Sequence, residues 1–154
     1  MSEKIIAPYG SWRSPITSDL IVAGTVRLGQ VELDGEDIYW IEGRPAEKGR
    51  NVIVKQAADG STVDVTPQPF NARTLTNEYG GGSFTVNQGE AFFSNFADQR
   101  LYRVAPGAEP QAVTMESKFR YADGIVDRPR NRFLCVREDH SIAGQEAKTT
   151  LAAI

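Results

Sequence analysis

Short apolar runs alternate with turn signals along most of the chain. The first four runs are rich in Val, Ile and Tyr, and they cover 25–33, 38–41, 52–55 and 62–65. Runs of this length, bounded by Gly, Asp and Pro, are typical of β-strands. Asp59-Gly60 predicts a tight hairpin, because both residues tolerate the positive φ angles of a type I′ turn. The pattern therefore predicts an antiparallel meander of four strands.

The same pattern recurs twice further along the chain. A second set of runs lies at 82–86, 91–94, 100–104 and 111–114. A third set lies at 121–126, 133–136 and 150–154. Few stretches keep apolar residues at helical spacing for three turns, so long helices are not expected. We therefore expect an all-β chain.

The spacing of the runs indicates one repeated unit. Tyr79 and Tyr121 are predicted to occupy equivalent positions of the repeat, 42 residues apart in similar strings, and Phe92 and Phe133 lie 41 apart. Units of about 40 to 50 residues with four strands are typical of β-propeller blades. A β-sandwich with hairpins of similar length is the alternative. The propeller interpretation divides 1–154 as follows: a lead-in at 1–24, blade one at 25–66, blade two at 78–114 and an incomplete blade three at 119–154.

Two blades and part of a third do not close a propeller ring, which needs about four to eight blades. We expect the chain to be part of something larger. The terminal blades would leave a sheet face bare at each end, and the predicted strand at 150–154 would be an edge without charge or proline. We therefore expect self-association of the isolated chain.

Several strings resemble the N-terminal region of prolyl oligopeptidase family serine peptidases, of the acylaminoacyl-peptidase and dipeptidyl-peptidase types. They are Ala7-Pro8-Tyr9-Gly10-Ser11-Trp12-Arg13-Ser14-Pro15-Ile16-Thr17, Asp37-Ile38-Tyr39-Trp40, Glu42-Gly43-Arg44-Pro45, Gly49-Arg50-Asn51-Val52-Ile53-Val54, Glu78-Tyr79-Gly80-Gly81-Gly82, Phe93-Ser94-Asn95-Phe96-Ala97-Asp98-Gln99-Arg100-Leu101-Tyr102, Arg120-Tyr121-Ala122-Asp123-Gly124 and Cys135-Val136-Arg137-Glu138-Asp139-His140. The resemblance implies a propeller that screens peptides by size above a C-terminal α/β-hydrolase domain with a Ser-Asp-His triad. That catalytic domain is absent from 1–154 and would follow far beyond Ile154.

The chain lacks the residues for hydrolase chemistry of its own. No Gly-x-Ser-x-Gly nucleophile motif occurs, and His140 is the single histidine available as a base. His140 follows two acidic residues in a predicted loop, where a solvated turn residue is the simpler interpretation. We expect no catalytic residue, no bound cofactor and no metal in this chain. The string Asp34-Gly35-Glu36-Asp37 lacks the alternating ligands of a calcium loop and predicts a turn.

The glycines and aromatic residues have structural interpretations. Gly80-Gly81-Gly82 is not followed by the Lys and Ser/Thr of a phosphate-binding loop, and it is better explained by crowding of the inner strands. The aromatic residues of the second strands are expected to form the packing between blades rather than a stacking platform. These residues are Tyr39, Trp40, Phe92, Phe93 and Phe133.

Four residues beside the innermost strands are candidates for lining the propeller channel and contacting peptide: Glu78, Tyr79, Arg120 and Tyr121. Ordinary pairing between blades is an equally good explanation for them.

Charge and composition narrow the class of function. The chain has 17 basic and 20 acidic residues, a formal net charge of −3, which does not favour nucleic acid as a partner. No apolar run approaches the roughly eighteen residues of a membrane span, and the first residues do not resemble a signal peptide. Cys135 is the only cysteine and is expected to be a buried apolar residue. We expect a cytoplasmic protein.

Two functions follow from these observations. The first is a non-catalytic propeller portion of a serine peptidase, which acts as a scaffold and a peptide-size filter for the hydrolase domain. Peptide substrates and that domain would be its partners. The second is a stand-alone module that binds a protein partner on its open faces. A reading frame that continues past Ile154 into a Gly-x-Ser-x-Gly motif would separate the two.

Overall fold

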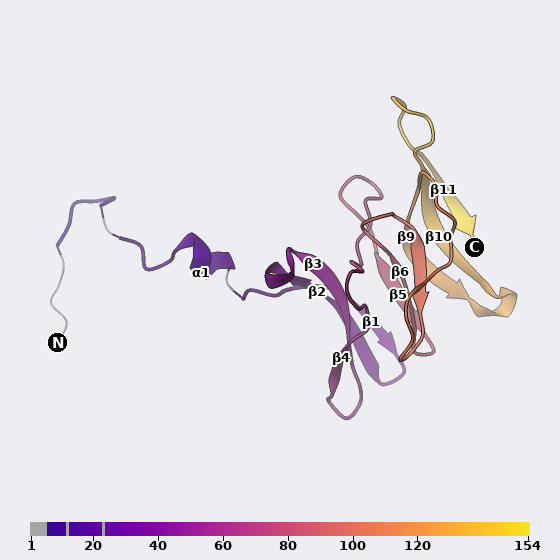
Figure 1. Cartoon of the computed structure of the whole chain (residues 1–154), viewed down its shortest axis with the longest axis horizontal. Helices are drawn as coiled ribbons and strands as arrows, with labels where there is room; N and C mark the ends of the chain where they lie inside the picture. Colours follow the sequence, from indigo (N-terminus) through magenta and orange to yellow (C-terminus); the bar gives the residue numbers. More distant parts are fainter. Residues whose placement is uncertain (1–5, 12, 23) are drawn as a thin grey trace.

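Three antiparallel sheets lie side by side in chain order, and they account for most of the regular structure (Figure 1). The computed structural model describes residues 6–11, 13–22 and 24–154, without the side chains of Asp19 and Val22. The remaining residues of the predicted lead-in, 1–5, Trp12 and Ala23, lie outside the described residues. The described lead-in contains the short helix α1 (Ser18–Val22) and extends away from the sheets (Figure 1).

The first sheet, blade 1, has the strand order β1-β2-β3-β4. The bounds of its elements are β1 Arg27–Asp34, β2 Asp37–Arg44, the 3-10 turn η1 Pro45–Glu47, β3 Arg50–Gln56 and β4 Thr62–Asp64. Alternation decides which residues face the core: Tyr39 and Ile41 on β2 are buried on the side toward the second sheet, whereas Leu33 on the opposite face is exposed.

The second sheet, blade 2, repeats this meander in the order β5-β6-β7-β8. Its strands are β5 Phe84–Asn87, β6 Glu90–Ser94, β7 Leu101–Val104 and β8 Gln111–Ala112. Blade 3 has three strands in the order β11-β10-β9, which are β9 Phe119–Asp127, β10 Arg132–Asp139 and β11 Lys148–Ala153, with the 3-10 turn η2 Arg128–Arg130 between the first two. The predicted fold, two four-stranded sheets and part of a third, is confirmed.

Two hydrophobic cores hold the sheets together. Between blades 1 and 2, the buried residues are Tyr39, Ile41, Ile53, Ala72, Phe84, Ala91, Phe93 and Val104. Between blades 2 and 3, they are Leu101, Tyr121, Phe133 and Cys135, with Phe92 packed against them. Tyr39, Phe92, Phe93 and Phe133 therefore form the packing between blades, as predicted. The prediction is wrong for Trp40, which is paired with Val31 on the outer face of blade 1 and is half-buried.

Burial also explains the state of the single cysteine. Cys135 is buried in the second core as expected. Loss of hydration raises the pKa of its thiol to about 11, and Arg137 opposes this rise only partly. The thiol is therefore protonated and unreactive at neutral pH.

One predicted turn has a different conformation. Asp59-Gly60 does form the β3–β4 hairpin, but of the two residues only Gly60 has a positive φ angle, of 83°. Ala57 N–H donates to the Ser61 carbonyl oxygen at 2.9 Å, so the loop has three residues rather than two. The Asp59 carboxylate accepts hydrogen bonds from the backbone N–H and the hydroxyl of Ser61, which favours this longer loop over a type I′ turn.

The outer faces of the first and last sheets are bare. Leu33 on blade 1 is 70% exposed, and Leu151 on blade 3 is 87% exposed. Blade 3 also ends at β11, an edge strand that pairs with β10 and with no other described strand. Apolar side chains thus remain in contact with water at both ends of the stack.

Candidate functional site

The segment between blades 1 and 2, residues 65–83, runs across one end of all three sheets, and we call it the connector. Ala72 N–H donates to the Asn51 carbonyl oxygen of blade 1 at 3.0 Å, and Arg73 N–H donates to the Ser94 carbonyl oxygen of blade 2 at 2.9 Å. Asn77 N–H donates to the Glu138 carboxylate of blade 3 at 2.7 Å. The connector therefore brings residues of all three blades to one surface.

The connector reverses direction at a tight turn. Asn77 and Glu78 have left-handed backbone conformations, with φ angles of 56° and 63°. The N–H of Gly80 closes the turn by donating to the Thr76 carbonyl oxygen at 2.8 Å. This geometry leaves the Tyr79 side chain 92% exposed. A large aromatic ring in water is a candidate contact for a ligand.

The glycines after this turn allow a close approach to blade 3. A Cβ atom on Gly81 would lie 3.0 Å from the Ala122 Cβ atom, and one on Gly82 would lie 2.9 Å from Asp123 Oδ1. Without side chains there, Gly82 N–H donates to Asp123 Oδ1 at 2.7 Å and the Gly82 carbonyl oxygen accepts from Asp123 N–H at 2.8 Å. The structural interpretation of these glycines is confirmed.

The four predicted channel-lining residues have different environments. Glu78 and Tyr79 lie on the connector turn, and Arg120 lies nearby because its Nη1 atom donates to the Leu75 carbonyl oxygen at 2.9 Å. Tyr121 is only 5% exposed and belongs to the core between blades 2 and 3, where burial raises the pKa of its hydroxyl. A role of these residues in lining a channel stays a prediction.

The repeat spacing wrongly predicted that Tyr79 and Tyr121 occupy equivalent positions. Tyr121 lies inside β9, whereas Tyr79 lies in a turn before β5 begins at Phe84. The physical reason is an irregularity in blade 3: the register of β9 shifts opposite residues 134–136, where Asp123 has a positive φ angle of 54°. The bulge places an extra residue in β9, so the residues before it are displaced in register relative to those before β5.

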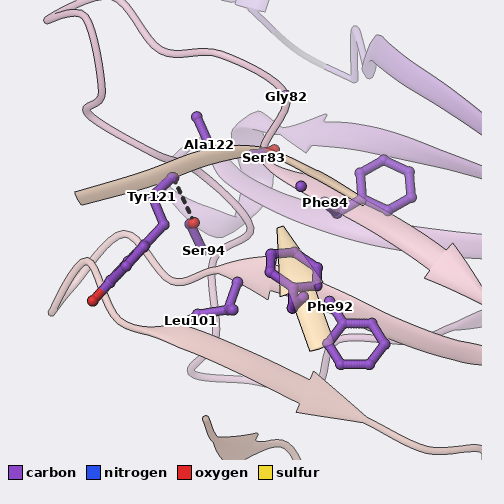
Figure 2. A pocket seen from close by; sticks show the side chains of 10 residues that line it. Gly82, Ser83, Phe84, Phe92, Ser94, Leu101, Tyr121 and Ala122 are labelled. Carbon is purple, nitrogen blue, oxygen red and sulfur yellow. Dashed lines mark hydrogen bonds between the residues drawn. The ribbon is translucent and has the colours of Figure 1, made fainter. Parts of the chain in front are cut away.

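A small void lies between blades 2 and 3 beside Tyr121 (Figure 2). Ser94 Oγ donates to the Tyr121 carbonyl oxygen at 2.7 Å at this void, and Leu101 and Phe92 also line it (Figure 2). Its volume is about 10 Å³, which is at the lower limit for one water molecule. This void is therefore part of the packing between blades and not a ligand site.

Tyr79 lines two larger hollows. One, of about 830 Å³, is lined by Asn77, Glu78, Tyr79, Glu138, His140 and residues 144–147. The other, of about 230 Å³, is lined by Arg27, Asn51, Arg73, Thr74, Ser83 and residues 79–81. One hollow is therefore acidic and the other basic, and Tyr79 lines both.

The basic hollow has a positioned guanidinium. Arg27 Nη2 donates to Asn51 Oδ1 at 3.4 Å, and Gly43 allows this because a Cβ atom there would lie 3.2 Å from Arg27 Nε. The acidic hollow has a positioned carboxylate, because Glu138 is 5% exposed and its second oxygen lies 3.0 Å from His140 Nε2. No local pattern distinguished Arg27, Arg73 or Glu138 in the sequence, because their positions depend on the path of the connector.

His140 lies beside a carboxylate. Among the residues that the structure describes, its ring is hydrogen-bonded to Glu138 and to no serine hydroxyl. Over the same part of the chain, no group of three or more His, Cys, Asp or Glu side chains is arranged to hold a metal ion. None of the described helices is long and apolar enough to cross a membrane.

The arrangement of sheets, cores and connector is that of the propeller region of prolyl oligopeptidase family peptidases, and the predicted resemblance is confirmed. The solved structures with this fold include the crystal structure of a puromycin hydrolase, which is 34% identical, with a TM-score of 0.82 over 96% of this chain. A mutant of that enzyme complexed with PGG matches equally well.

A puromycin-hydrolyzing peptidase of Mycobacterium tuberculosis is 32% identical, with a TM-score of 0.79 over 97% of this chain. The chain spans about a quarter of the length of these proteins, 24% in each case. No family model matches the sequence, and no curated protein sequence matches it at a significant level.

Proposed function

We propose that this chain is a non-catalytic propeller portion of a prolyl oligopeptidase family serine peptidase, where it acts as a scaffold and a peptide-size filter for a hydrolase domain. The observation that carries the proposal is the match of almost the whole chain to a quarter of the puromycin hydrolase chain. The substrates of the complete enzyme would be small aminoacyl amides such as puromycin, or acylated amino acids and dipeptides.

The connector supports the role as a filter. It is tied to all three blades by backbone hydrogen bonds, so the end of the stack that carries Tyr79 is held in a fixed shape. A rigid rim excludes large substrates better than a flexible one, because widening it would break several hydrogen bonds together. The acidic and basic hollows beside Tyr79 would contact the polar backbone and termini of short peptides as they pass.

A complementation experiment tests the proposal. The purified chain alone should not hydrolyse puromycin or chromogenic acyl-amino-acid and dipeptide substrates, and a fluorophosphonate probe should not label it. Mixing it with the separately expressed remainder of its open reading frame should produce hydrolysis. Labelling of the chain alone at a serine, abolished by His140→Ala, would contradict the proposal, as would the absence of a hydrolase domain from the reading frame.

The filter is tested in the complete enzyme with Tyr79→Ala. We expect an altered KM for peptides of increasing length and an unchanged kcat for the shortest substrate, because the proposed chemistry takes place in the hydrolase domain. Tyr9→Ala is the matched control, since Tyr9 is also fully exposed but lies in the lead-in. Equal kinetics of the two variants over all substrate lengths would refute a role of Tyr79 in filtering.

The bare outer faces favour a second candidate, a module that binds a protein partner. Exposed Leu33 and Leu151 provide apolar surface for such a contact. This candidate predicts that the open reading frame has no hydrolase domain and that a heterologous partner covers these faces.

A further inference from the structure

The basic hollow lies beside the first strands of the blades. Gln30 Nε2 of β1 donates to the Phe84 carbonyl oxygen of β5 at 2.6 Å, so the first strands of blades 1 and 2 are neighbours. Asp123 N–H of β9 donates to the Gly82 carbonyl oxygen, just before β5, at 2.8 Å. Arg27, the first residue of β1, lines the hollow. The hollow therefore lies at one end of the row of first strands, the row that borders the channel in a closed propeller.

Three buried polar side chains line this hollow. Thr74 is 3% exposed, and Asn51 and Ser83 are each 8% exposed. Asn51 Nδ2 and Ser83 Oγ both donate to the Ala72 carbonyl oxygen, at 3.4 and 3.2 Å. Thr74 Oγ1 accepts from Thr76 N–H at 3.1 Å. Buried polar groups that are hydrogen-bonded to the backbone keep their positions, so the polar lining is formed before any ligand arrives.

Arg27 adds a guanidinium whose donors are only partly used. Its Nη2 atom donates to Asn51 Oδ1 at 3.4 Å, a long contact for a charged donor. Among the residues that the structure describes, no carboxylate lies within ion-pair distance of Arg27. Arg44, by contrast, contacts three carboxylates at 2.6–3.3 Å. The planar fork of N–H donors on Arg27 is therefore left for a carboxylate from outside the described chain.

The other charge of the hollow has the same sign. Arg73 also lines it, and its guanidinium carbon lies 4.8 Å from the centroid of the Phe96 ring. Arg73 likewise has no carboxylate partner among the described residues, and no Asp or Glu of the described chain lines the hollow. Two like charges repel each other, and an anion near both is attracted by both. The hollow, of about 230 Å³, is therefore suited to a small anionic group.

We propose that the basic hollow binds the free carboxylate at the C-terminal end of a short peptide, with Arg27 as the main contact and Arg73 as a second charge. The choice of a peptide rests on the proposed function, since the peptidase role is what brings peptide carboxylates to this surface. The inference adds a substrate class to that role: peptides whose carboxyl end is free.

Titrations followed by saturation-transfer NMR test the site on the full chain with N-acetylglycine, a small peptide-like carboxylate. N-Acetylglycinamide is the matched probe, because an uncharged amide replaces the carboxylate. The acid should bind and the amide should not, and added salt should weaken binding of the acid. Arg27→Gln should weaken it about tenfold, the effect of losing a charged hydrogen-bond donor, and Arg73→Gln should weaken it less. Arg13→Gln, at an exposed arginine of the lead-in, should leave it unchanged.

Four results would overturn the inference. The first is no binding of N-acetylglycine, and the second is equal binding of the acid and the amide. The third is a probe site elsewhere, shown by unchanged affinity of Arg27→Gln with circular dichroism proving that the variant is folded, or by loss of binding in Arg13→Gln. The fourth is tighter binding of inorganic phosphate than of N-acetylglycine, which would make the hollow a phosphate site.

Failure of this inference is distinguishable from failure of the proposed function. If the complementation mixture hydrolyses puromycin but the chain does not bind N-acetylglycine, only the carboxylate site is wrong. If the chain binds the acid through Arg27 but its reading frame has no hydrolase domain, the carboxylate site stands and the peptidase role is wrong.

Discussion

Replacement of Gly124 by alanine tests the packing between blades 2 and 3 most directly. A Cβ atom at this position would overlap the Cζ atom of Phe133 and would lie 2.6 Å from its Cε1 atom. Carbon atoms in contact prefer separations of about 3.5 Å, so the ring would have to move by roughly 1 Å or more. Phe92 stacks on the Phe133 ring with centroids 5.3 Å apart, so the ring has little space to withdraw.

The expected cost follows from two opposing effects. Overpacking of a well-filled core typically costs about 1–3 kcal/mol, and this overlap belongs at the upper end of that range. Alanine also restricts the unfolded chain relative to glycine, which stabilises by about 0.4–1 kcal/mol when the φ angle is compatible. The net effect of Gly124→Ala is a loss of about 2 kcal/mol in the free energy of unfolding, or about 4–8 °C in Tm for a chain of this size.

Urea denaturation followed by circular dichroism measures the effect, with all variants at one protein concentration. Gly29→Ala is the matched control, because its Cβ atom would lie at an ordinary 3.4 Å from Ile41. Phe133→Leu should reduce the cost of Gly124→Ala in a double-mutant cycle, since the smaller side chain leaves room for the methyl group. Equal stability of the Gly124→Ala and Gly29→Ala variants would refute the packing argument.

Three further predictions concern reactivity, pH and assembly. Cys135 should react with a disulfide reagent at pH 8 only after unfolding in guanidinium chloride, because burial keeps its thiol protonated; rapid reaction of the native chain would contradict this. Arg50 holds the pKa of Glu47 below its ordinary value of 4.5, so this carboxylate contributes stability above pH 4.5 that is lost as the pH falls through its folded pKa. The difference in stability between the unmodified chain and Glu47→Gln should therefore shrink in acid, and a constant difference from pH 7 to pH 3 would disprove the assignment. The isolated chain should self-associate through its bare faces in light scattering, and Leu33→Lys with Leu151→Lys should shift it toward single chains; a monodisperse single chain without these substitutions would exclude this.

The strands were predictable because their signal is local. Short apolar runs between turn residues located every strand, but they did not distinguish the two faces of β2, where Tyr39 is buried between the blades and Trp40 is not. The burial of Cys135 followed from its place in the apolar run 133–136, which matches the second strands of the other sheets. Strand alternation and short turns each involve residues that lie within a few positions of one another, so a short stretch of sequence is enough to recognise them.

The candidate site was less predictable because it depends on contacts far apart in the sequence. Glu138 contacts Asn77 across 61 positions, and no local pattern indicates such a pair. The bulge at Asp123 shifts the register of β9, so a constant repeat length misplaced Tyr121 relative to Tyr79. The position of a residue in the repeat therefore predicted the strand to which it belongs, but it did not predict which residues surround its side chain.

The path of the connector also has a consequence for synthesis on the ribosome. Asn77 is made 61 positions before Glu138, the residue that accepts its N–H. At about 5–20 residues per second, the turn beside Tyr79 must wait roughly 3 to 12 seconds for that partner. Blades 1 and 2 can pair their strands during this interval, but the connector cannot reach its final path. The rim of the stack is therefore completed only after β10 has left the ribosome, so a nascent chain displays an unfinished rim that chaperones can recognise.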